Sequence, residues 1–349
     1  MSENTTDSHD AILLVSFGGP EKPDEVIDFL ENVTRGSGIP RERLATVGEH
    51  YYLFGGRSPI NDQNKALMAA LEAELVSRGH QVPVYWGNRN WHPFIDEALD
   101  QLVADGRRQV LMLSTSAYPS YSGCRSYREA LAESLARLPD PPQVERIGHY
   151  GLDDGFVAAN AAALQAAAAQ LPGARVVFVT HSIPTPMEDS AGPDGQAYTA
   201  WHREVAERVF ARAGLEGEWD FAYCSRSGRP TDPWLEPDVN DHLEQLHEQG
   251  INSVVLAPIG FISDHMEVIY DLDTEARKTC ERLGIEMVRA ATAGTHEAFV
   301  RGLADRIEWA MGARGPEGLS EQGNQLGRAR CGGEGCCRNL RRPETPAID

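Results

Sequence analysis

The chain has 349 residues, with 32 Lys and Arg against 52 Asp and Glu, so its formal net charge is −20. Hydrophobic residues make up 41% and charged residues 24%, which is typical of a chain that folds around a core and excludes a disordered or fibrous protein. The acidic balance also argues against a nucleic-acid binder and against attachment to anionic lipid by charge. At about 150 residues per domain, the length predicts two domains.

The amino-terminal stretch MSENTTDSHD is polar and acidic, and it lacks the basic and apolar regions of a signal peptide. No run of about 18 apolar residues follows, so no membrane-spanning helix is predicted. We therefore expect a cytoplasmic protein without integral membrane association. Thiols stay reduced in that compartment, so the six cysteines are expected to be free thiols or metal ligands rather than disulfides.

Short apolar runs rich in β-branched residues alternate with longer helical patterns along the chain. Continuous apolar runs of this length are typical of parallel strands that are covered on both faces. The predicted strands lie near 11–17, 82–87, 108–115, 143–148, 175–180, 219–224, 252–258 and 286–290. The clearest helical patterns cover 62–78, 94–105, 126–137 and 155–170.

This alternation predicts an α/β fold of two similar Rossmann-like domains, each a four-stranded parallel sheet flanked by helices. The boundary is expected at 171–173, which gives an N-terminal domain over 1–171 and a C-terminal domain over 172–312. The remaining segment, 313–349, is rich in Gly and Arg, and its composition alone predicts disorder. Because open parallel sheets bind ligands at the carboxyl ends of their strands, we expect the site in a cleft between the two halves.

Three motifs of common nucleotide and hydrolase sites are missing from the sequence. It contains no G-x-x-x-x-G-K-[ST], no G-x-G-x-x-G after the first predicted strand and no G-x-S-x-G. The predicted chemistry therefore uses neither a P-loop nucleotide site nor a nicotinamide cofactor.

His181 follows the strand pattern RVVFVT, at one of the predicted carboxyl ends. Such a histidine is either a hydrogen-bonded side chain at a strand end or a neutral imidazole that accepts a proton near neutral pH. Pro184 restricts the turn that follows, which favours a fixed direction for the imidazole.

Glu267, Asp271 and Glu275 are spaced at i, i+4 and i+8, which predicts that they share one face of a helix capped by Ser263. A solvated helix face is one interpretation of this pattern. The other is a row of ligands for a divalent cation, because hard cations prefer carboxylate oxygens. The spacing alone leaves both interpretations open.

Cys331, Cys336 and Cys337 lie within seven residues of the chain. In a reduced compartment such a group favours a metal site. Zinc and an iron–sulfur cluster both accept four thiolates, so a fourth ligand would have to come from another part of the chain.

Several separated segments together resemble the ferrochelatase family. They are LLVSFGGP (13–20), GGRSP (55–59), THSIP (180–184), DPWLEPDV (232–239) and GFISDHMEVIYDLD (260–273), and the resemblance runs from about residue 11 to 312. It implies the chelatase fold, a porphyrin cleft between the two domains and an enzyme, formally a lyase, that inserts Fe(II) into a porphyrin in heme biosynthesis.

The resemblance also implies roles for individual residues. By matched position, His181 and Glu267 correspond to the catalytic histidine and its acidic partner, and both, with Asp271 and Glu275, are expected to contact the metal. The substrate-binding residues implied in the same way are Phe17, Arg35, Ser58 and Tyr127. Phe17 stands where some relatives have tyrosine, and Asn90 stands near a position where some have histidine.

Some ferrochelatases carry a [2Fe–2S] cluster held by three carboxy-terminal cysteines and one internal cysteine. The internal one lies after the third strand, and here the segment SAYPSYSGCRSY supplies Cys124. The implied ligands are therefore Cys124, Cys331, Cys336 and Cys337, in a tail (313–349) that docks back on the first half.

The soluble Gram-positive-type members are associated with coproporphyrin III, so the resemblance favours coproporphyrin III and ferrous iron as substrates, with coproheme III as product. It also suggests neighbouring enzymes of the heme pathway as partners. The alternatives are a protoporphyrin IX ferrochelatase, a cobalt or sirohydrochlorin chelatase of similar fold, and a non-catalytic tetrapyrrole carrier or iron–sulfur redox sensor.

Overall fold

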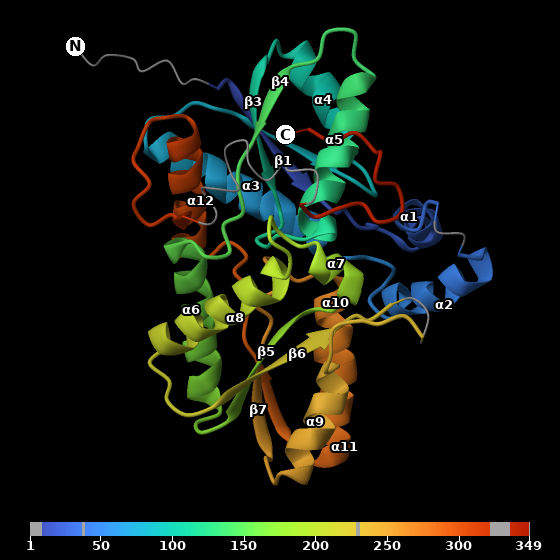
Figure 1. Cartoon of the computed structure of the whole chain (residues 1–349), viewed down its shortest axis with the longest axis vertical. Coiled ribbons are helices and arrows are strands. Elements are labelled where there is room, and N and C mark those ends of the chain that lie inside the picture. Colours follow the sequence, from blue (N-terminus) through green and yellow to red (C-terminus); the bar gives the residue numbers. More distant parts are fainter. Residues whose placement is uncertain (1–8, 37–38, 228–230, 322–335, 349) are drawn as a thin grey trace.

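A computed structural model of the chain describes residues 9–36, 39–227, 231–321 and 336–348. Two four-stranded parallel sheets lie one above the other along the long axis of the molecule (Figure 1). Their strand orders are β2-β1-β3-β4 and β6-β5-β7-β8, so the two halves share one topology. The predicted fold class is confirmed, and each of the eight strands forms within a few residues of its predicted position. They are β1 (Ala11–Ser16), β2 (Val84–Asn88), β3 (Gln109–Ser114), β4 (Gln143–Arg146), β5 (Arg175–His181), β6 (Trp219–Cys224), β7 (Ser253–Ala257) and β8 (Glu286–Arg289).

Helices flank the first sheet on both faces because successive side chains of its central strand point in opposite directions. Ile12 and Leu14 of β1 pack in the same cluster as Leu67 of α3, whereas Leu13 packs with Leu99 of α4 on the other face. The helical elements of this half are η1 (Pro23–Glu25), α1 (Val26–Val33), α2 (Arg41–Tyr52), α3 (Ile60–Ser77), α4 (Ile95–Ala104), the π-helical turn η2 (Tyr121–Arg125) and α5 (Ser126–Ala136). The next helix, α6 (Asp154–Gln170), packs instead beside the second sheet, against β7, β8 and α8 (Ala197–Arg212) (Figure 1).

The second sheet follows the same rule. Phe178 of β5 packs with Val205 of α8, and its neighbour Val179 packs with Leu243 of α9 on the opposite face. The helical elements here are α7 (Thr185–Asp189), α8 (Ala197–Arg212), α9 (Val239–Glu248), α10 (Met266–Ile269), the π-helical turn η3 (Asp271–Ala276), α11 (Arg277–Leu283) and α12 (Glu297–Ala310).

The two halves are joined through helices and through the loops at the carboxyl ends of their strands. Arg78, at the end of α3, pairs with Asp305 and Glu308 of α12 at 2.6 and 2.8 Å. Nearer the strand ends, the hydroxyl of Tyr118 donates to the carbonyl of Ile259 at 2.8 Å. The carboxyl ends of β3 and β7 therefore meet, as the predicted cleft requires.

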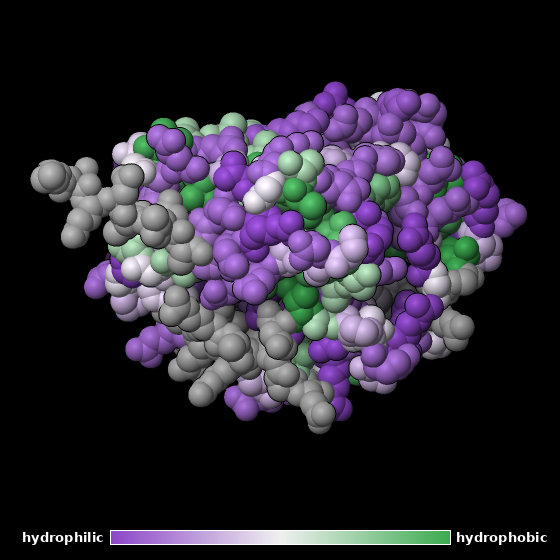
Figure 2. Space-filling view, turned by 90° about the horizontal axis from the view of Figure 1, so that it is seen from above, coloured by the Kyte–Doolittle hydropathy of each residue, from purple (hydrophilic) through white to green (hydrophobic). Residues whose placement is uncertain are grey.

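None of the helices in the described part of the chain is both long and apolar enough to cross a membrane. Seen from the end that carries the first sheet, the surface is mostly hydrophilic, with hydrophobic residues in small scattered groups (Figure 2).

Candidate functional site

His181 is the last residue of β5, and the turn after it fixes the imidazole. Its Nδ1 donates to the carbonyl of Ser182, so in the neutral ring the lone pair is on Nε2. The hydroxyl of Ser182 in turn donates to the carbonyl of Leu235 at 2.8 Å, and the amide of Leu235 donates to Ile183 at 3.0 Å. The segment DPWLEPDV thus braces the THSIP turn, which explains why two motifs far apart in sequence belong to one site.

Glu267 faces His181 from the start of α10. The distance from Nε2 of His181 to Oε1 of Glu267 is 3.3 Å, and the other carboxylate oxygen lies 3.4 Å from Nδ1 of His265. The side chains of His181 and Glu267 are 30% and 45% exposed, so a ligand can reach both from solvent.

The electrostatics of this pair favour an ion pair at neutral pH. Burial opposes a charge on His181, but the Glu267 carboxylate outweighs it and raises the pKa of the imidazole to about 8. Burial acts to raise the pKa of Glu267. The opposite effect of His181 and His265 is larger, so the pKa of Glu267 is lowered to about 2. Burial is also the main cause that lowers the pKa of His265, so the imidazolium belongs to His181.

The acidic row does not lie on a regular α-helix, so that expectation is wrong. The helix begins at Met266 with His265, rather than Ser263, as its cap, and after one turn it widens into η3. The amide of Glu275 donates to the carbonyl of Tyr270, five residues earlier. A spacing of i, i+4 does not distinguish an α-helix from a π-helical turn, which is frequent at functional sites.

Asp271 is the middle carboxylate of the row, and Ser225 holds it. Ser225 follows β6 with a φ of 62°, a left-handed conformation that costs energy for a residue with a Cβ, and its hydroxyl donates to Asp271. Burial raises the pKa of Asp271 to about 7, against the Ser225 hydrogen bond and with a further contribution from Glu267 and Glu275. Along the row, Glu267 is paired with His181, Asp271 has a pKa near neutrality, and Glu275 is exposed to solvent.

Within the described ranges, no group of three or more His, Cys, Asp or Glu side chains is close enough together to hold a metal ion. His181, Glu267, Asp271 and Glu275 thus form a sequence of neighbours along the cleft and not one preformed cage.

A group of aromatic side chains from the first half lies near the acidic row. Phe17, Tyr51 and Trp91 each contact Phe29 edge to face, with ring centroids 5.8–6.2 Å apart. Burial raises the pKa of Tyr51, and the carboxylates of Glu267 and Asp271 add to the rise, so this apolar group lies within the field of the acidic row. A flat apolar ligand would fit between such a surface and the acidic row.

The other residues implied in substrate binding are spread around the same half. Tyr127 is buried beneath the guanidinium of Arg89, whose Cζ lies 5.0 Å from the ring centre. Ser58 is buried against Gly19, where a Cβ would come within 2.7 Å of the Ser58 Cβ. Arg35 is exposed just after α1 and donates to Asn32 at 2.6 Å. Tyr127 lies within the field of Glu267, Phe17 belongs to the aromatic group around Phe29, and Arg35 is exposed to solvent.

Cys331 lies outside the described residues, but the other three cysteines expected as cluster ligands belong to one buried hydrophobic cluster. The Sγ atoms of Cys336 and Cys337 are 3.9 Å apart. Arg146 donates to Sγ of Cys124 at 3.7 Å, and the amide of Gly192 donates to Sγ of Cys337 at 3.4 Å.

Residues 336–348 lie against both halves of the molecule. The amide of Cys337 donates to Ser190, just after α7, at 2.6 Å. Further along, Asn339 donates to Glu129 at 2.9 Å, and Arg128 donates to the carbonyl of Ile348 at 2.6 Å. This part of the tail is packed on α5, although composition alone predicts disorder, because specific contacts compensate for its sparse apolar surface.

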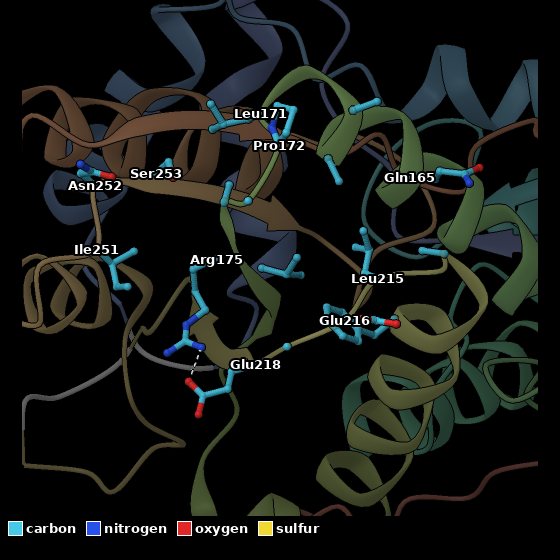
Figure 3. A pocket seen from close by; sticks show the side chains of 18 of the residues that line it. Gln165, Leu171, Pro172, Arg175, Leu215, Glu216, Glu218, Ile251, Asn252 and Ser253 are labelled. Atoms are coloured by element: carbon cyan, nitrogen blue, oxygen red, sulfur yellow. Dashed lines mark hydrogen bonds and ion pairs between the residues drawn. The ribbon is translucent and has the colours of Figure 1, made fainter.

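A cavity of about 730 Å³ lies elsewhere (Figure 3). Arg175, Leu171 and Ser253 are among its lining residues, at the amino ends of β5 and β7, and Arg175 pairs there with Glu218 at 2.6 Å. It contains none of the expected site residues.

Sequence reasoning missed His265 and Ser225. His265 stands within the quoted segment SDHMEV, two residues before Glu267, and its position at the start of a helix was the available signal. Ser225 had no signal, because its role depends on a left-handed backbone and on a partner 46 residues away.

Comparison with known proteins agrees with this geometry. The protein called coproporphyrin III ferrochelatase from Streptomyces coelicolor is 51% identical over 328 residues, which cover 88% of each chain. The protein of the same name from Leifsonia xyli is 44% identical over all of this chain and 96% of its own.

Two solved structures share the fold. SirB from Bacillus subtilis with Fe3+ has a TM-score of 0.52 at 13% identity, covering 91% of this chain and 98% of its own. CbiX, described as the terminal enzyme of siroheme biosynthesis in denitrifying bacteria, has a TM-score of 0.50 at 16% identity, covering 86% and 99%. The family model for ferrochelatase matches residues 9–311. This protein therefore belongs to the ferrochelatase family.

Proposed function

We propose that the protein is a coproporphyrin III ferrochelatase, which inserts Fe(II) into coproporphyrin III and releases coproheme III in the heme pathway of the cytoplasm. The observation that carries the proposal is the solvent-accessible His181–Glu267 pair, in the half whose strand ends meet those of the first sheet through the Tyr118–Ile259 contact. Relatives named for this activity match most of the chain at 51% and 44% identity, which supports the choice of porphyrin.

Insertion exchanges two protons on the pyrrole nitrogens for one Fe(II), so the site has to accept protons and deliver a cation. We assign the first task to His181. Since its pKa is raised to about 8, the imidazole has to pass its own proton on before it accepts another. Glu267 and Asp271 lead away from it, and the carboxyl of Asp271 titrates near pH 7, which suits proton exchange with solvent at neutral pH.

The same row is suited to guide the metal. Carboxylate oxygens bind a hard divalent cation, and neighbouring sites of unequal exposure let the ion move instead of being trapped. Glu275 is exposed, Asp271 is partly buried and Glu267 contacts His181, so the row leads from solvent to the imidazole. Fe(II) is substrate here.

We assign the porphyrin to the opposite wall. Phe17 and its aromatic neighbours would contact the macrocycle, while Ser58, Tyr127 and the cationic Arg35 would contact propionates at its edge. A porphyrin with four propionates has more to gain from such polar partners than one with two, which favours coproporphyrin III over protoporphyrin IX.

The assay that tests this function uses purified protein, Fe(II) under anaerobic conditions and either coproporphyrin III or protoporphyrin IX. We expect metalated product from coproporphyrin III at the higher kcat/KM. Faster metalation of protoporphyrin IX would overturn the substrate choice. Porphyrin binding without metalation of either compound would favour a tetrapyrrole carrier.

We also propose that Cys124, Cys331, Cys336 and Cys337 hold a [2Fe–2S] cluster. Cys124, Cys336 and Cys337 belong to one buried hydrophobic core, although in this structure they are not close enough together to form a metal-binding group. The sulfur atoms of Cys337 and Cys124 accept hydrogen bonds from Gly192 and Arg146. Such donors stabilise thiolate charge around an iron–sulfur centre. The group would supply ligand bonds that order residues 336–348 between α5 and α7, and no step of metal insertion is assigned to it.

A further inference from the structure

A buried hydrogen-bond network lies directly behind His181. Thr180, the preceding residue of β5, is fully buried, and its hydroxyl lies 3.0 Å from the Tyr198 hydroxyl and 2.9 Å from Nε2 of His202. Tyr198 and His202 stand four residues apart on α8, so both side chains reach β5 from the same helix face. The Tyr198 hydroxyl also donates to the backbone carbonyl of His181 at 2.8 Å.

The protons of this network have only one consistent arrangement. Burial lowers the pKa of His202 to about 3, so its ring is neutral. Nδ1 of His202 donates to the carbonyl of Tyr198 at 2.6 Å, which leaves Nε2 as an acceptor. The Thr180 hydroxyl must then donate to Nε2, and the Tyr198 hydroxyl is the donor shared by Thr180 and His181. Each group has a defined role, so loss of one hydroxyl leaves a buried partner unsatisfied.

The network also reaches the segment that leads to Glu267. The ring of Tyr118 stacks on His202 with centroids 3.5 Å apart, and its hydroxyl holds the carbonyl of Ile259. The next residue, Gly260, is packed so tightly that a Cβ there would lie 2.0 Å from Oγ1 of Thr180. One buried group of side chains therefore contacts the backbone at His181 and the backbone seven residues before Glu267.

We propose that Thr180, Tyr198 and His202 are positioning residues, which hold His181 in register with Glu267 for metal insertion. They do not touch the cleft ligands; they act by fixing the strand end and the approach of the following segment. The expected change in kcat rests on the proposed function. The expected change in the position of His181 can be measured without any turnover.

Two matched pairs of variants test the role. Thr180→Val keeps the branched shape and removes the hydroxyl, whereas Thr180→Ser keeps the hydroxyl. Tyr198→Phe removes the donor to the His181 carbonyl. Its control, Tyr223→Phe, removes the hydroxyl of another buried tyrosine, which lies 3.4 Å from the Thr199 hydroxyl on α8. Small displacements of reacting groups are costly, so T180V and Y198F should each lower kcat for iron insertion by roughly tenfold, with KM for the porphyrin within about twofold of wild type.

T180S should recover most of the rate lost in T180V, and Y223F should match wild type. Thermal unfolding of all four variants separates positioning from general loss of fold. Equal kcat values for T180V, T180S and wild type would overturn the proposal and leave the ferrochelatase function intact.

A second readout does not depend on activity. In metal-free protein labelled with 15N-histidine, the imidazole signals of His181 should shift in T180V and Y198F and stay in place in T180S and Y223F. Unchanged His181 signals in T180V and Y198F would overturn the proposal even if wild type inserts no iron. If the wild type inserts no iron but the His181 signals still shift in T180V and Y198F, the network is supported and the proposed function is rejected.

Discussion

The two halves of the molecule carry a π-helical turn at the same topological place, after the third strand of each sheet. In the first half, η2 follows β3 and carries Cys124 into a buried apolar cluster. In the second half, η3 follows β7 and α10 and carries Asp271 and Glu275. The same backbone feature thus presents a thiol in one half and carboxylates in the other.

The carboxyl ends of the first strand of each sheet, β1 and β5, also carry different side chains. Phe17 follows β1 and His181 ends β5, in the segments FGGP and HSIP, so an apolar ring and an imidazole occupy corresponding positions. The first half therefore contributes apolar rings, and the second contributes charged groups. The comparison teaches that topology fixes where the site is, while a few residues at equivalent points decide what each half contributes.

The largest expected effect tests the sulfur side of this comparison. Cys124→Ser should abolish the proposed [2Fe–2S] centre, so that the visible absorption and acid-labile sulfide expected of the wild type both disappear, because the hard hydroxyl is a poor replacement for a thiolate. Cys280→Ser is the matched control, since Cys280 is an equally buried cysteine near η3 in the second half. A full cluster in C124S would contradict the ligand assignment, and zinc without sulfide in wild type would indicate a structural zinc site.

The next effect tests the gradient along the acidic row. Glu267→Gln removes the carboxylate that pairs with His181 and should lower kcat by about 10²-fold or more, in the range of other acid–base groups. Glu275→Gln should cost only a few-fold, because Glu275 is exposed and a neighbouring carboxylate remains. Steady-state kinetics on both variants measure the difference. Equal losses would show that the row acts as one unit.

A smaller effect concerns the pH at which His181 becomes neutral. Its pKa is raised, so the imidazole is charged below about pH 8 and loses its charge as the pH rises through that value. The ion pair with Glu267 therefore contributes fully to stability below the ordinary histidine pKa and is lost toward alkaline pH. E267Q removes the carboxylate that contributes most to the rise and leaves burial opposed only by the Ser182 carbonyl and Asp271, so the pKa of His181 should fall. Titration of the imidazole signals by NMR gives both numbers, and an unchanged pKa in E267Q would contradict the assigned cause.

Much of this architecture follows from local sequence patterns. The strands were predictable because continuous apolar runs such as AILLVS are buried on both faces, and His181 because it ends such a run. The π-helical turns were not predictable, since the same spacing fits a regular helix. The network behind His181 was also hidden, because Thr180 and Tyr118 become neighbours of α8 only through tertiary packing.

The most direct test of the account is the rate of Fe(II) insertion into coproporphyrin III by His181→Ala, with porphyrin binding measured by fluorescence in the same samples. His247→Ala is the control, because it also removes an imidazole, at an exposed position on α9. The account predicts that insertion falls by at least about 10²-fold in H181A while porphyrin affinity stays within a few-fold of wild type. Insertion by H181A at the wild-type rate would contradict it.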